Sequence, residues 1–126
     1  MDYYENALKW HKSAEFSIEG GFYQQSVSQS CLAAELFLKS VLIVIQPKSE
    51  LDKSHDTLGI FNVIARKYPT DKDVLSGVRM CRKYFTESRY PYNGGEVYTE
   101  EFARQFLEYV ENVKDYVDNE CNGGCN

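Results

Sequence analysis

The sequence predicts an all-α protein, an up-and-down bundle of about five helices in a single domain. Three observations support this prediction. Apolar residues recur at spacings of three and four along most of the chain, the connections between these stretches are short, and no stretch alternates like a β-strand. The chain has 126 residues, 43% of them hydrophobic, so it can bury one core of ordinary size.

The first helix is expected to begin at Asp2, because Glu5 follows it with the spacing of a capping pair. Gly20-Gly21 is expected to end it, since glycine terminates helices at little steric cost. His11 falls on its polar side, where a solvated histidine needs no special role. One apolar face runs along this helix through Tyr3, Ala7, Trp10, Ala14 and Ile18.

The second helix, from Tyr23 to Ile45, is the longest and most apolar, and Pro47 stops it. Two apolar stripes lie side by side on it, so most of its circumference is expected to be buried. We therefore predict that it is the core helix. The breadth of its apolar surface also favours dimerisation through the long apolar helices.

Three further helices are expected to support it. The third runs from about Asp56 to Pro69, the fourth is started by Thr70, and Thr99 caps the fifth. We expect the helical bundle to occupy residues 1–118, with residues 119–126 as a flexible C-terminal tail.

The net charge of −5 argues against a free-standing nucleic-acid-binding protein, whose footprint is a basic surface. A local basic patch remains compatible with it. No apolar run approaches the length of a membrane span, and the first residues lack the pattern of a signal peptide. We expect a cytoplasmic protein with no membrane or DNA partner.

The usual motifs of catalytic and cofactor sites are missing, and no cofactor is expected. The glycine pairs lack the spacing and the lysine of a phosphate-binding loop. Cys121 and Cys125 are close together, but a structural zinc site needs four ligands, so no metal site is predicted. Cys31 and Cys81 fit helical patterns and are expected to be small core residues.

One basic and aromatic segment combines groups that bind phosphates with groups that stack on bases. Arg79, Arg82 and Lys83 share a face of the fourth helix, and Arg89 follows with Tyr90 and Tyr92. Arginine binds phosphate bidentately, and an exposed tyrosine, including Tyr84, can stack on a base. The alternative is a solvated helix face beside a turn packed by tyrosines.

His55 precedes the third helix, at a terminus whose free backbone N–H groups favour anions. It is a candidate ligand-binding residue at the edge of the groove that Arg89, Tyr90 and Tyr92 are expected to line. The alternative is that His55 and Asp56 only cap and orient the helix.

Together these patterns resemble the HEPN family of small helical domains over residues 2 to about 118. The match rests on loose motifs in a fixed order. They are Tyr4 to Trp10, Gly21 to Tyr23, Ser28 to Leu42, Ser54 to Leu58, and Arg89-Tyr90-Pro91.

The resemblance implies a homodimer, a prokaryotic setting and, for many members, a minimal nucleotidyltransferase partner in a two-gene module such as a toxin–antitoxin pair. Other members are metal-independent ribonucleases with an arginine and a histidine spaced R-x4-6-H. Arg89 is similar to that arginine, but Gly94, Gly95 and Glu96 stand where the histidine would be.

We therefore predict a non-catalytic HEPN module that homodimerises and binds a nucleotidyltransferase-like partner, and with it nucleotide or RNA. No catalytic residue is assigned. The nucleotide or RNA contacts would be Arg89, Tyr90, Tyr92, His55 and Arg82. The alternatives are a divergent HEPN ribonuclease toxin and a purely structural helical dimer.

Overall fold

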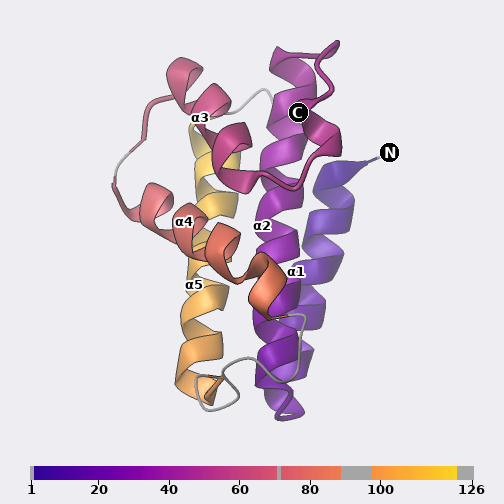
Figure 1. The fold of residues 1–126 in the computed structure, drawn as a ribbon, viewed down its shortest axis with the longest axis vertical. Coiled ribbons are helices and arrows are strands. Elements are labelled where there is room, and N and C mark those ends of the chain that lie inside the picture. The colour runs from indigo at the N-terminus through magenta and orange to yellow at the C-terminus, as the bar shows by residue number, and fades with distance from the viewer. Residues whose placement is uncertain (1, 71, 89–97, 122–126) are drawn as a thin grey trace.

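A computed structural model describes residues 2–70, 72–88 and 98–121 (Figure 1). Within these residues the regular structure is entirely helical, as the sequence predicts. The elements are α1 (Tyr3–Glu19), α2 (Tyr23–Ile45), the short 3-10 helix η1 (Leu51–Lys53), α3 (Thr57–Lys67), α4 (Lys72–Glu87) and α5 (Glu100–Asn119).

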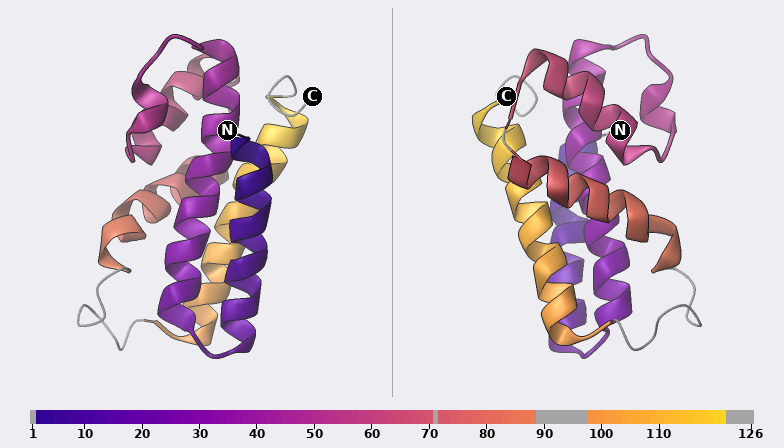
Figure 2. Two further views of the ribbon diagram at one scale, coloured as in Figure 1. Left: turned by 90° about the vertical axis from the view of Figure 1, so that its right-hand side faces the viewer. Right: turned by 60° about the vertical axis from the view of Figure 1, so that its left-hand side comes forward.

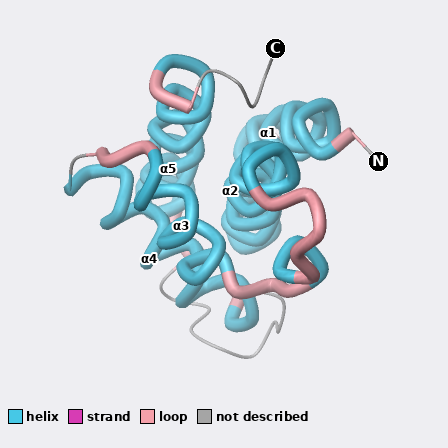
Figure 3. Tube along the Cα trace, turned by 90° about the horizontal axis from the view of Figure 1, so that it is seen from above, coloured by secondary structure: helices cyan, strands magenta, loops and turns pink. Residues whose placement is uncertain are grey.

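The three long helices α1, α2 and α5 run along the long axis of the molecule, and α3 and α4 lie across one side (Figures 1 and 2). Helix α1 is antiparallel to α2, whereas α2 and α5 run in the same direction. The chain returns between them through α3 and α4. Seen from above, these two shorter helices lie together on one side of the bundle (Figure 3).

Helix α2 is the core helix, because α1, α3, α4 and α5 all pack against it. Its side chains from Ala33 to Leu42 are all buried, although two of them, Glu35 and Lys39, are charged. Helices of the same chain thus cover the apolar surface of α2 from Ala33 to Leu42, whereas Ile43 and Val44 near its end are exposed. The covered surface does not by itself require a second copy, which was the sequence argument for dimerisation.

By length and a mean hydropathy of 1.6, α2 is the one described helix that could cross a membrane. However, 61% of that apolar stretch is buried inside the bundle. This burial is what the central helix of a globular domain requires.

Three predicted helix starts are confirmed by side-chain caps. The carboxylates of Asp2 and Asp56 accept hydrogen bonds from Glu5 N (3.0 Å) and Gly59 N (3.1 Å). The Thr99 hydroxyl accepts from the N–H of Phe102 at 3.1 Å. Each cap satisfies an N–H group that the helix itself cannot pair.

The ordered C-terminal helix extends past the predicted boundary at 118. Helix α5 ends at Asn119, and the following Cys121 is fully buried. The Tyr116 hydroxyl donates a hydrogen bond to the carbonyl of Tyr68, which ties α5 to the end of α3. Residues 122–126, with Cys125, lie outside the described residues.

Candidate functional site

The candidate site is assembled from α2, the start of α3 and the second half of α4. Of the predicted contact residues, His55 and Arg82 are described. Arg89, Tyr90 and Tyr92 lie outside the described residues, as do the three positions after Asn93. The described part of the site therefore surrounds His55 and Arg82.

His55 binds a carboxylate of the core and does not cap α3. Its Nδ1 lies 3.1 Å from Oε2 of Glu35 on α2, although 62% of the imidazole side chain is exposed. Its ring stacks on Phe85 of α4, with centroids 5.1 Å apart and planes inclined by 26°. Asp56 alone caps the helix. These contacts fix the position of an exposed ring from two different helices.

Glu35 is the central residue of this arrangement, and its side chain is only 1% exposed. Lys39, one turn further along α2, places Nζ 3.0 Å from the same Oε2 that contacts His55. The other oxygen, Oε1, is buried and has no hydrogen-bond partner among the described residues. A carboxylate held this deeply is stable only when opposite charge and hydrogen bonds compensate its desolvation.

Sequence reasoning missed Glu35 and Lys39 as members of the site. A signal for them existed, since they are two opposite charges four residues apart in a helix that is apolar on nearly all sides. Charged residues are almost never fully buried unless they are paired. Their spacing therefore pointed to a pair inside the core.

The Glu35 carboxylate gives His55 a defined orientation. When the carboxylate accepts a hydrogen bond from Nδ1–H, the imidazole is neutral and its other nitrogen, Nε2, is a hydrogen-bond acceptor. When His55 carries both protons, Nε2 becomes a donor with positive charge. The pair can therefore present either a base or a cation at the surface.

The two cysteines beside this group, Cys31 and Cys81, are buried. Burial raises the pKa of the Cys31 thiol well above its ordinary value, and a hydrogen bond with Cys81 and the Glu35 charge act in the same direction. A thiol without its thiolate form is a poor nucleophile and a poor metal ligand. The prediction that Cys31 and Cys81 are core residues is confirmed.

Arg82 extends the polar group along α4. Its Nε lies 3.4 Å from Oδ1 of Asp56, and both side chains are about half exposed. Arg79 and Lys83 lie beside it, and these three residues with Leu58 line an open pocket of about 570 Å³. Three cationic side chains around one depression are suited to a phosphate group.

Tyr84 is part of an aromatic cluster between α4 and α5. Its ring packs edge-on against Tyr98, Phe102 and Phe106, with centroids 5.3 to 6.4 Å apart. Tyr84 thus joins α4 to α5. These contacts favour the alternative in which the tyrosines of this segment pack against the bundle.

Comparisons with known proteins agree with this fold. The family model described as "HEPN domain" matches residues 1–120. The crystal structure of TT1696 from Thermus thermophilus has a TM-score of 0.82 at 20% identity, covering 93% of this chain and 94% of that one. ST0689, an archaeal HEPN homologue, gives 0.75 at 22% identity over 96% of both chains. No curated protein sequence matches the chain.

Proposed function

The chain belongs to the HEPN family, and we propose that it binds the phosphates of RNA or of a nucleotide at the basic pocket on α4. The observation that carries this proposal is the convergence of Arg79, Arg82 and Lys83 on one pocket. Among the described residues, Arg82 has one carboxylate partner, Asp56, and an anionic ligand would give the three cations a shared one.

His55 would complete this surface. It comes from the start of α3, is held by Glu35, and precedes Asp56, the ion-pair partner of Arg82. A phosphate that enters the pocket would compete with Asp56 for the Arg82 guanidinium. Breaking this half-exposed ion pair would cost little free energy, because such pairs contribute about 0–1 kcal/mol.

The segment that follows α4 would supply further contacts. Its Arg89 would bind phosphate, and Tyr90 and Tyr92 would stack on bases. These roles rest on the family resemblance and on the position of Arg89 directly after Ser88, the last described residue of that stretch.

A divergent ribonuclease is the second candidate function, and the Glu35–His55 contact favours it. A histidine oriented by a carboxylate through Nδ1 has its Nε2 available to take a proton from a 2′-hydroxyl or to protonate a leaving oxygen. His55 would then act where the R-x4-6-H pattern lacks its histidine. The non-catalytic module remains the leading proposal, because that pattern is incomplete.

The partner proposals rest on the family. They are a homodimer, a minimal nucleotidyltransferase and a cytoplasmic setting within a module of the toxin–antitoxin kind. A surface suited to a protein partner lies on α1 and at its turn into α2, where Phe16 is 64% and Phe22 59% exposed. Contiguous exposed apolar patches often mark contact sites, and these two rings would belong to such a patch.

Binding of a short single-stranded RNA, followed by fluorescence anisotropy, tests the leading proposal. Arg82→Ala should weaken binding, whereas Arg104→Ala should leave it unchanged. Arg104 is a matched control, since it is also about half exposed and paired with an exposed carboxylate, that of Glu100. Equal affinities of the two variants would contradict the proposed pocket.

The same samples separate the two candidate functions. A module that only binds leaves the RNA intact on a denaturing gel. Cleavage by the wild-type protein that disappears in His55→Ala, while Arg104→Ala still cleaves, would establish the ribonuclease instead. A thermal-shift series with nucleotides would show which phosphate-bearing ligand stabilises the folded state.

A further inference from the structure

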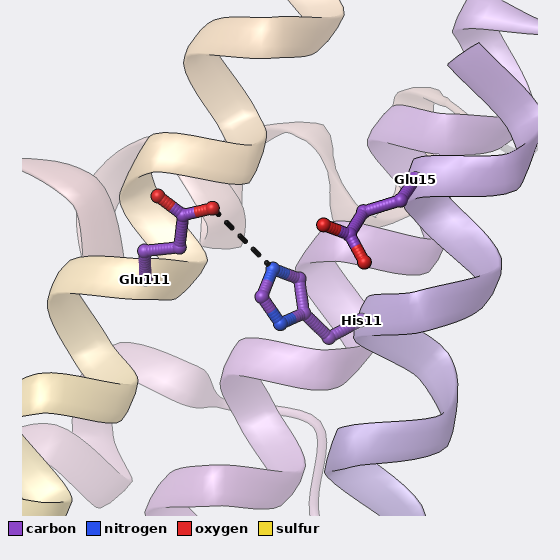
Figure 4. A group of neighbouring side chains, drawn as sticks. All are labelled: His11, Glu15 and Glu111. Carbon is purple, nitrogen blue, oxygen red and sulfur yellow. Dashed lines mark ion pairs between the residues drawn. The ribbon is translucent and has the colours of Figure 1, made fainter. Parts of the chain in front are cut away.

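A second polar group joins α1 to α5, away from the pocket on α4. His11 and Glu15 lie one turn apart on α1, and Glu111 reaches toward them from α5 (Figure 4). One ligand atom from each of the three residues lies within 4.8 Å of the other two. The sequence pattern had placed His11 among solvated residues, but its side chain is only 14% exposed.

The imidazole of His11 has an unmet requirement. Its Nε2 is shielded from solvent and has no hydrogen-bond partner among the described residues. The nearest carboxylate oxygen, Oε2 of Glu111, is 3.8 Å away, too far for a hydrogen bond. Buried polar atoms in native proteins nearly always have a partner, so this nitrogen points to a missing one.

The spacing of the three groups suits a metal ion. Bonds of about 2.0–2.2 Å to nitrogen and oxygen in a tetrahedral arrangement set neighbouring ligand atoms about 3.4 Å apart. The 3.8 Å between Nε2 and the Glu111 oxygen is already close to this value. The Glu15 and Glu111 side chains are exposed, so small rotations would bring their oxygens to bonding distance.

We propose that His11, Glu15 and Glu111 form a binding site for a divalent transition-metal ion, with Zn²⁺ as the preferred occupant. One imidazole nitrogen and two carboxylate oxygens are ligands that Zn²⁺ accepts, whereas Mg²⁺ and Ca²⁺ prefer oxygen alone. The remaining coordination position is open to water. Two negative charges from the glutamates balance the charge of the ion.

Such an ion would clamp α1 to α5. Where α1 begins and α5 ends, the Tyr4 hydroxyl already donates a 2.7 Å hydrogen bond to Asp118. Because the ligands come together only in the folded chain, binding stabilises the folded state, and the stabilisation grows with the logarithm of the free ion concentration. The alternative is that no metal binds and that a positively charged His11 forms ion pairs with the two carboxylates.

Calorimetric titration of the reduced protein with ZnCl₂, in a thiol-free reductant, tests the site. Wild-type protein should bind one ion. Removing only a hydrogen-bond partner of a metal ligand weakens metal binding at least about tenfold. Glu111→Gln and His11→Ala each change a ligand itself, so each should weaken binding by at least that factor. Glu108→Gln is the control, since it removes the same charge from an exposed position of α5 outside the cluster. The Glu111→Gln change keeps the side-chain volume at an exposed position, so the fold should be retained.

Cobalt distinguishes this site from one built on cysteines. A Co²⁺ complex of the proposed site should show ligand-field bands without thiolate-to-metal charge transfer. A charge-transfer band, binding unchanged in Glu111→Gln, or no saturable binding by the wild-type protein would each overturn the proposal.

Discussion

Nδ1 of His55 lies 3.1 Å from Oε2 of Glu35, so an exposed histidine is anchored to a carboxylate that is 1% exposed. The same oxygen forms an ion pair with the Lys39 ammonium, one turn further along α2. One buried atom thus joins the core helix to the surface that we propose binds phosphate.

The Glu35–Lys39 pair should behave as a unit in stability measurements. Glu35→Leu leaves the Lys39 ammonium buried without its partner, which costs about 3–5 kcal/mol. Adding Lys39→Met should return part of this loss, because the second change removes the stranded charge. Urea unfolding of both single variants and the double variant measures the coupling. Additive losses in the double variant would show that the two charges do not depend on each other.

His55→Ala should separate stability from function. Its side chain is 62% exposed and Glu35 keeps Lys39 as a partner, so unfolding should become easier by only about 1 kcal/mol. RNA or nucleotide binding should weaken clearly, because the variant removes the imidazole that we propose extends the phosphate-binding surface next to the pocket. A large loss of stability with unchanged binding would assign His55 a structural role only.

Tyr116 should make the protein sensitive to alkali. Burial raises its pKa above the ordinary value of 10.0, so the folded state holds the phenolic proton more firmly than the unfolded chain. The stability from this group is complete below pH 10 and decreases as pH rises beyond that value. Tyr116→Phe should therefore show a shallower loss of unfolding free energy above pH 10.

The Tyr116→Phe variant should also differ from wild type at neutral pH, and part of its alkaline slope should come from other tyrosines. The variant also loses the hydrogen bond to the Tyr68 carbonyl, a constant cost of about 1 kcal/mol at neutral pH. Part of the alkaline slope should persist, since burial also raises the pKa of Tyr3, Tyr98 and Tyr109. An identical slope in wild type and variant would contradict the assignment to Tyr116.

The turn between α1 and α2 provides a matched pair of glycine substitutions. Gly21 has φ of +81°, and a side chain in this left-handed region costs about 1–2 kcal/mol, so Gly21→Ala should lower stability by that amount. Gly20 has φ of −83°, an ordinary helical value. Gly20→Ala would meet only the exposed Phe22 ring, which can turn away. Thermal unfolding should therefore show a lower midpoint for Gly21→Ala alone.

Much of the fold could be predicted from local sequence signals. Asp2, Asp56 and Thr99 mark helix starts through side chains that act within three residues, and the structure confirms all three caps. The periodicity of α2 likewise identified the core helix. It could not tell whether the apolar surface is covered by the same chain or by another, because periodicity carries no information about the covering element.

The site was harder to predict because its contacts join distant residues. The sequence identified His55 and Arg82, but the partner of His55 is twenty positions away in a helix that reads as apolar. Likewise His11 and Glu111 are separated by nearly the whole chain, and neither position stands out alone. Only the packing of α1 and α2 against the other helices brings these groups together.

The salt dependence of RNA binding tests the central claim most directly. Each phosphate contact to a single strand contributes about 0.7 to the slope of log affinity against log salt. Replacing Arg79, Arg82 and Lys83 together by alanine should therefore flatten the slope by about 2 units. Replacing Arg66, Lys67 and Arg104, which are exposed and lie elsewhere, makes the same change in net charge and should leave the slope unchanged. Equal slopes in the two triple variants would contradict a phosphate-binding pocket on α4.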